Sequence, residues 1–209
     1  MLIRKEHLHT GALLGIWKME ESREELLALF PGTLRSEALG YVESIRSERR
    51  SIEWLSTRVM LLQLLGEGKI IHNRKDGSPY IADSKQLISI SHTREYAAIL
   101  LHEHAPVGID IETRTERVSR IADKFISEKE YIDPTRSTLH QLLHWSAKES
   151  LYKLIGMQGI DFKKHLQIHP FTPDTEGVML ATETRSAASH SYRIYYEVHP
   201  DYVLTWTTG

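Results

Sequence analysis

Cysteine is absent from the 209 residues of the sequence. Its absence excludes disulfide scaffolds, cysteine-ligated zinc, thiol nucleophiles and iron–sulfur clusters. Apolar runs are also short, since none approaches the roughly 18 residues of a membrane-spanning helix. The N-terminal residues 1–7 carry charges where a secretory leader would need an apolar centre. We therefore expect a cytoplasmic protein with no membrane segment.

Neither sign of charge is in excess, because 26 Lys and Arg residues face 28 Asp and Glu residues, a formal charge of −2. This balance argues against a non-specific nucleic-acid binder, which carries a net basic charge or a basic stripe. The composition, 41% hydrophobic and 26% charged, is typical of a globular protein. The length corresponds to one large domain or two small ones.

Hydrophobic periodicity predicts helices followed by strands, twice along the chain. The predicted helices cover 22–30, 34–65, 116–131 and 137–156. The predicted strands cover 11–17, 88–92, 96–101, 107–112 and parts of 192–206. We therefore predict an α+β protein with two halves, 1–105 and 106–209, that pack as one unit. A weak similarity between 95–100 and 201–205 hints at an internal repeat.

Asp110 and Glu112 alternate with Ile109 and Ile111 in a predicted strand. Residues two apart share a face of a strand, so the two carboxylates project together while the isoleucines face a core. Two adjacent carboxylates repel unless a cation lies between them, and hard oxygen ligands suit Mg²⁺. The alternative is a solvated polar face at the end of a strand.

The predicted helix 137–156 places Trp145, Glu149 and Lys153 on one face, four residues apart. Taken alone, a Glu and Lys pair at this spacing is most often ordinary helix surface. Together with Asp110 and Glu112 it makes three carboxylates and a lysine. Such a set can hold Mg²⁺ and neutralise a phosphate that bridges to it.

Ser91 and His92 are neighbours in a predicted strand, so they point to opposite faces and cannot act as a nucleophile and its base. No nucleophile elbow is present either. His92 is either a phosphate donor or an ordinary histidine. The pairs His102/His104 and His140/His144 have metal-compatible spacing but no third ligand in the sequence.

Basic residues recur in the predicted helix 34–65. Four of its arginines form either a solvated helix face or an anion clamp, since arginine binds phosphate bidentately; they are Arg46, Arg49, Arg50 and Arg58. No phosphate-binding glycine loop with the spacing of a nucleotide-binding motif is present.

The ordered set of motifs resembles the 4′-phosphopantetheinyl transferase superfamily. The resemblance is carried by Val-Gly-Ile-Asp-Ile-Glu at 107–112, Phe-Ile-Ser-Glu-Lys-Glu-Tyr at 125–131 and Trp-Ser-Ala-Lys-Glu-Ser-Leu-Tyr-Lys at 145–153. Upstream, 77–81 and 90–93 look like the earlier motifs of the family. The length matches the longer subgroup, similar to the surfactin-synthetase activator, which fuses two halves in one chain. This resemblance implies an α+β fold of two similar halves about a pseudo-twofold axis, with coenzyme A between them.

The resemblance also implies a reaction and its residues. The enzyme would transfer 4′-phosphopantetheine from coenzyme A to a serine of an apo acyl or peptidyl carrier protein, as in fatty-acid biosynthesis, and release adenosine 3′,5′-bisphosphate. Asp110, Glu112 and Glu149 would hold Mg²⁺ against the pyrophosphate, and Lys153 would neutralise phosphate oxygens. The base would be Glu149 or a water bound to the metal. A monomer is expected from the fused halves.

Nucleotide contacts follow from the same resemblance. Ser91, His92 and one of Arg49 and Arg50 would contact the phosphates, and the turn Gly77-Ser78-Pro79 would lie along the adenine. The family often has a lysine inside this turn, where this chain has Ser78, so Lys75 or Lys85 would substitute. The family's Gly-Lys-Gly after the last helix is also missing, since residues 156–159 read Gly-Met-Gln-Gly.

Two functions other than a transferase are compatible with parts of the sequence. A Mg²⁺-dependent nuclease is disfavoured, because the lysine follows Glu149 by four residues and not two, and the net charge is negative. A non-catalytic module that binds coenzyme A or a carrier protein is disfavoured because all three carboxylates are present. Replacement of Glu149 by glutamine separates this module from an enzyme.

Overall fold

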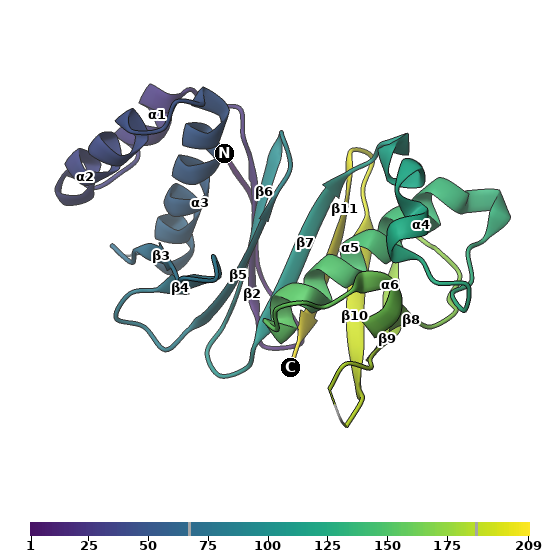
Figure 1. Ribbon diagram of the computed structural model, residues 1–209. Helices are drawn as coiled ribbons and strands as arrows, with labels where there is room; N and C mark the ends of the chain where they lie inside the picture. The colour runs from purple at the N-terminus through teal and green to yellow at the C-terminus, as the bar shows by residue number, and fades with distance from the viewer. Residues whose placement is uncertain (67, 187) are drawn as a thin grey trace. The chain divides into compact units, whose positions relative to one another are not determined.

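Two antiparallel sheets, each packed against one long helix, organise the chain (Figure 1). The computed structural model describes residues 1–66, 68–186 and 188–209, which divide into two units, 1–104 and 105–209. Both units mix helices and strands, so the predicted α+β class is confirmed. Within the described residues, no helix has the length and apolar character needed to span a bilayer.

The first unit contains a four-stranded sheet with the order β1-β2-β6-β5 and a small β3-β4 ribbon. Its elements are β1 (Leu2–His7), β2 (Leu13–Lys18), α1 (Arg23–Ala28), α2 (Gly32–Glu43), α3 (Glu48–Leu65), β3 (Ile71–Asn73), β4 (Pro79–Ile81), β5 (Leu87–His92) and β6 (Tyr96–His102). Helix α3 packs on β2 and β6, and its buried residues Leu55 and Val59 join Trp17 and Ile99 in one apolar core.

The second unit contains a five-stranded sheet with the order β7-β11-β10-β9-β8. Its strands are β7 (Val107–Thr113), β8 (Leu166–Ile168), β9 (Glu176–Glu183), β10 (His190–Val198) and β11 (Tyr202–Thr208). Its helices are α4 (Ala122–Phe125), α5 (Ser137–Ile155) and α6 (Phe162–His165), with short 3₁₀ turns η1 (Glu116–Arg120) and η2 (Pro134–Arg136). Helix α5 packs across β7 and β11.

Helix 34–65 was predicted as continuous, and this is wrong. The structure has α2 and α3 in its place, because Ser47 adopts an extended conformation and its side chain accepts a hydrogen bond from the backbone N–H of Arg50. A serine in this position begins a new helix instead of continuing the old one. Helix α3 then ends at Gly66, which adopts the left-handed conformation with φ 75°.

The predicted helix 116–131 is also wrong. Only η1 and α4 form there, because the next backbone groups bond to buried side chains. The Phe125 carbonyl accepts a hydrogen bond from Lys148, and the Ser127 N–H donates to Glu130. Strands β1, β3, β4, β8 and β9 were not predicted, whereas the predicted helix 137–156 is confirmed as α5.

Candidate active site

Strand β7 presents Gly108, Asp110 and Glu112 toward helix α5. Asp110 is only 3% exposed and Glu112 is partly buried. Ile109 and Ile111, which alternate with them, are fully buried. The two carboxylates therefore share a face, as the alternation of the sequence predicts.

Helix α5 contributes three side chains to the same place. Trp145 Nε1 donates a hydrogen bond of 2.7 Å to Glu112 Oε1. Lys153 Nζ lies 2.8 Å from Asp110 Oδ1 and also donates to the Ile109 carbonyl at 3.0 Å. Residues 145, 149 and 153 follow one another along one helix face, so Glu149 lies between the two contacts. The structure thus brings together Asp110, Glu112, Glu149 and Lys153.

Burial and mutual repulsion change the acidity of these carboxylates. Burial, with the charges of Asp110 and Glu149, raises the pKa of Glu112 to about 7, although the Trp145 hydrogen bond and Lys153 oppose the shift. Burial and Asp110 also raise the pKa of Glu149, again against Lys153. One lysine is therefore too little positive charge for three partly buried carboxylates.

A divalent cation would relieve this repulsion, and the donor set of three carboxylates fits the oxygen preference of Mg²⁺. The three carboxylates do not form a ready-made ligand shell, since the described residues contain no preassembled metal-binding group of three acidic, histidine or cysteine side chains. The same finding covers the pairs His102/His104 and His140/His144. The three carboxylates therefore fit Mg²⁺ in the type of their donor atoms and in their negative charge.

Gly108 determines how closely α5 approaches β7. A Cβ on Gly108 would lie 1.9 Å from the Ser150 carbonyl oxygen and 3.0 Å from the Leu154 Cβ. Backbone cannot rotate out of the way, so any side chain at residue 108 would displace the helix. Gly108 lies within the 107–112 motif, but this role could not be predicted, since nothing local in the sequence reveals what faces a glycine.

Helix α5 is also joined to strand β11 by hydroxyl groups that the sequence analysis did not single out. Ser150 Oγ donates to the Thr205 carbonyl at 3.0 Å, and Thr205 Oγ1 donates to the Ser146 carbonyl at 2.8 Å. All three residues are fully buried. Their spacing of four along the helix is the signal that could have found them, because it places both serines on one face.

Lys148, which precedes Glu149 in α5, forms a fully buried ion pair with Glu130. Lys148 Nζ lies 2.8 Å from Glu130 Oε2 and donates to the carbonyls of Phe125 and Phe162. Glu130 in turn accepts backbone hydrogen bonds from Ser127 and Ile168. Charge pairs this deeply buried require such complete hydrogen bonding. The pair therefore ties α5 to the segment after α4 and to β8.

Several residues predicted to bind nucleotide meet in the first unit. A cavity of about 910 Å³ is lined by Arg50, Gly77, Pro79 and His92. The turn that carries Gly77 depends on its φ of 87°, a conformation that favours glycine. Arg46 and Arg58 line the cavity as well, so three arginines and a histidine face one space, and this arrangement suits a phosphate.

Four other predicted residues lie outside the lining of this cavity. Arg49 is largely exposed and pairs with Glu53 at 2.8 Å, so the geometry favours Arg50 over Arg49. Ser78 bonds instead to Asp76, Lys75 is exposed and Ser91 is buried in β5. Glu53, which the sequence analysis missed, lines the cavity and lies 3.7 Å from His92 Nδ1.

Comparison with known proteins agrees with the motifs. Residues 106–207 match the model of the 4′-phosphopantetheinyl transferase superfamily. The 4′-phosphopantetheinyl transferase gsp of Aneurinibacillus migulanus is 32% identical over 126 residues, which are 56% of this chain and 52% of the relative. The chain thus spans about half the length of the curated relative it matches. The matched segment 106–207 contains β7 and α5 and therefore all four residues of the charged cluster.

Proposed function

We propose that this chain, whose residues 106–207 match the model of the 4′-phosphopantetheinyl transferase superfamily, transfers the 4′-phosphopantetheine group of coenzyme A to a serine of an apo acyl or peptidyl carrier protein. The observation that carries the proposal is the cluster of Asp110, Glu112, Glu149 and Lys153 between β7 and α5. Phosphoryl transfer is accelerated mainly by positioning and by charge stabilisation, which such a cluster supplies.

Glu149 accepts the proton of the carrier serine in this proposal. Its carboxylate lies close to Asp110 and Lys153, and glutamate is one of the side chains that act as general bases. The serine oxygen forms a bond to the β-phosphorus of coenzyme A, and the bond from that phosphorus to the oxygen bridging to the α-phosphate breaks. Adenosine 3′,5′-bisphosphate leaves with this oxygen and its electron pair.

Lys153 lies beside Asp110 and balances charge where the phosphate oxygens are expected. Asp110, Glu112 and Glu149 would hold Mg²⁺, which would offset the negative charge of the pyrophosphate when bound. Trp145 keeps the Glu112 carboxylate oriented through its indole N–H. Gly108 keeps α5 close enough to β7 for these groups to act together.

The nucleotide end of coenzyme A is assigned to the first unit. Arg50 and His92 would contact its phosphates, and the 77–79 turn its adenine, within the 910 Å³ cavity. We further propose that the protein acts in the cytoplasm as a monomer. Carriers of fatty-acid, polyketide and peptide synthesis are all candidate acceptors.

The test is a mass measurement. The full chain is incubated with Mg²⁺, coenzyme A and an apo acyl carrier protein, and the carrier is weighed intact. We expect a gain of one phosphopantetheinyl group that a chelator abolishes. Glu149→Gln should lower the transfer rate at least about 100-fold, since general bases contribute factors of this size. Glu176→Gln is the matched control, because Glu176 is an exposed acid of the same unit.

Two results would contradict the proposal. Unchanged turnover in Glu149→Gln would remove Glu149 from its role. No mass gain with several carriers, despite measurable binding of coenzyme A, would instead favour a non-catalytic module that binds coenzyme A or a carrier protein.

A further inference from the structure

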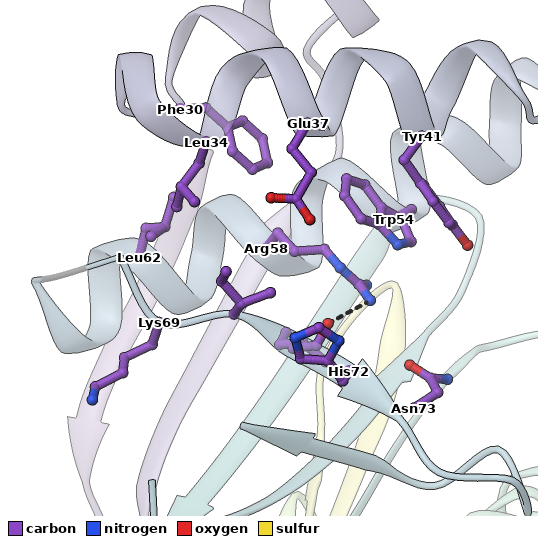
Figure 2. Close-up of a pocket in the computed structure, with 13 residues that line it drawn as sticks. Phe30, Leu34, Glu37, Tyr41, Trp54, Arg58, Leu62, Lys69, His72 and Asn73 are labelled. Carbon is purple, nitrogen blue, oxygen red and sulfur yellow. Dashed lines mark hydrogen bonds between the residues drawn. The ribbon is translucent and has the colours of Figure 1, made fainter. Parts of the chain in front are cut away.

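A second cavity, of about 670 Å³, lies in the first unit beside α2, α3 and β3 (Figure 2). Its volume is within the range of small-molecule sites. Five of its lining residues also line the nucleotide cavity, and the others are its own. The residues not shared are Phe30, Leu34, Glu37, Ala38, Leu62, Lys69, Ile70 and His72.

One side of this cavity is apolar. The turn after α1 contributes Phe30, helix α2 contributes Leu34 and Ala38, and helix α3 contributes Leu62. Figure 2 shows Phe30, Leu34 and Leu62 at one end of the cavity. Contact with such walls removes an aliphatic chain from water, worth about 0.8 kcal/mol for each buried CH₂ group. This end therefore suits a hydrocarbon chain.

The opposite side carries one half-buried cation, Arg58. The Arg58 guanidinium lies 4.3 Å from the Trp54 ring centroid, and Trp54 stacks on Tyr41. Figure 2 shows the guanidinium reaching toward β3, where it donates to the Ile71 carbonyl at 3.4 Å. Its other partner is Thr57 Oγ1 at 3.0 Å. Both partners are neutral oxygens.

Arg58 has no carboxylate partner within the part of the chain that the structure describes. Its Nε atom is buried and has no hydrogen-bond partner there. Burial lowers the pKa of Arg58 to about 10, so the group is still charged at neutral pH. A half-buried cation with a buried N–H group that lacks a hydrogen-bond partner favours an anionic ligand.

The remaining charges limit the size of that negative charge. Among the described lining residues, Arg58 and Lys69 are basic and Glu37 is acidic, which leaves one net positive charge. Glu37 points into the cavity in Figure 2 and would repel a dianion. A single carboxylate matches both the net charge and the planar fork of the guanidinium.

We propose that this cavity binds a small amphiphilic monocarboxylate, with its carboxylate on Arg58 and its hydrocarbon chain against Phe30, Leu34 and Leu62. The site is separate from the transfer chemistry, although Arg58 also lines the cavity assigned to the nucleotide. Leu34 lines only the proposed site, so a change at Leu34 addresses this site alone.

The test is calorimetric titration of octanoate into the full chain, with octan-1-ol as the uncharged comparison. We expect saturable octanoate binding and at least about tenfold weaker binding of octan-1-ol, since a charged hydrogen bond contributes about 1.5–3 kcal/mol. Arg58→Gln should weaken octanoate binding by a similar factor. Arg94→Gln, an exposed arginine of the same unit, is the matched control and should bind octanoate as the parent does.

Leu34→Trp keeps the proposal falsifiable if Arg58→Gln fails to fold. The larger side chain should fill the cavity and abolish octanoate binding while affinity for coenzyme A stays unchanged. The proposal is overturned if the parent shows no saturable binding up to about 5 mM octanoate, if octan-1-ol binds equally well, or if either variant binds octanoate like the parent. It is equally overturned if Leu34→Trp loses coenzyme A affinity, because the cavity would then belong to the nucleotide site. Carrier modification is measured separately, so failure of the transferase proposal is distinguishable.

Discussion

The two units share one arrangement, a long helix packed on an antiparallel sheet. They differ in whether charged or titratable side chains are buried in the interior. In the first unit α3 meets the sheet through apolar side chains such as Leu55, Val59 and Ile99. Among the described residues, every buried Asp, Glu, Lys or His side chain lies in the second unit. These side chains are Asp110, Glu130, His140, His144, Lys148 and Glu183. The comparison teaches that the second unit holds charges beside an apolar core of its own, in a poorly solvated interior where their interactions are stronger.

The largest expected effect comes from breaking the buried ion pair of the second unit. Glu130→Gln leaves Lys148 buried without its counter-charge, which should lower the free energy of unfolding by about 3–5 kcal/mol. Urea denaturation measures this loss. Glu176→Gln is the control in the same unit, since Glu176 is exposed. A loss below about 1 kcal/mol would mean that the pair is no more stabilising than a surface ion pair.

Two glycines give the next effect, because each lies where a strand faces the long helix of its unit. A Cβ on Gly108 would meet the Ser150 backbone at 1.9 Å, whereas one on Gly15 would meet only the tip of the Leu64 side chain at 2.7 Å. Gly108→Ala should therefore cost about 3 kcal/mol and Gly15→Ala about 1 kcal/mol.

Denaturation and transfer assays test this pair of glycines together. Gly108→Ala should also lower transfer, since it moves Glu149 and Lys153 away from Asp110. Gly15→Ala should leave transfer nearly unchanged. Equal losses of stability in the two variants would contradict a backbone contact at Gly108 as the cause.

Another effect is a dependence of stability on pH that arises in the second unit. Burial lowers the pKa of His144 to about 3 and also lowers the pKa of His140, although Asp133 opposes the shift at His140 and Lys148 adds to that at His144. Their folded-state pKa values lie below the ordinary 6.5, so the unfolded chain binds protons more readily below pH 6.5. Stability is therefore present above pH 6.5 and lost as the pH falls toward 3, by at most about 1.4 kcal/mol per pH unit for each histidine.

Urea denaturation between pH 7 and pH 5 measures this slope. His144→Phe should reduce it, because phenylalanine keeps an aromatic ring beside Phe171 without a proton site. His104→Gln, an exposed histidine of the first unit, should not change it. An identical slope in parent and His144→Phe would place the pH dependence elsewhere.

Local pattern predicted the elements that carry the chemistry. The alternation at 107–112 and the periodicity at 137–156 predicted β7 and α5, and the spacing of Glu149 and Lys153 predicted their shared face. These inferences succeed because side-chain direction within one element depends only on its repeat. The assignment of metal and nucleotide residues is still a prediction.

Contacts between distant segments were not predictable in this way. The Glu130–Lys148 pair joins residues 18 apart in the chain, and the Trp145–Glu112 hydrogen bond joins residues 33 apart. The helix predicted over 116–131 failed for the same reason, since tertiary partners for Phe125 and Ser127 replaced helical ones. The break at Ser47, by contrast, was predictable, because serine is a preferred N-cap residue. It was missed because the apolar periodicity continues on both sides of Ser47.

Because Trp145 donates a hydrogen bond to Glu112, its fluorescence can report on the state of the carboxylate cluster. The indole N–H points at one of the three crowded carboxylates, so its fluorescence depends on the charge that this carboxylate carries. A cation taken up by Glu112 would draw that charge away from the indole and shift its emission. Titration of Mg²⁺ into the protein, with Trp145→Phe as the blank, would then follow occupancy in real time without substrate, label or turnover.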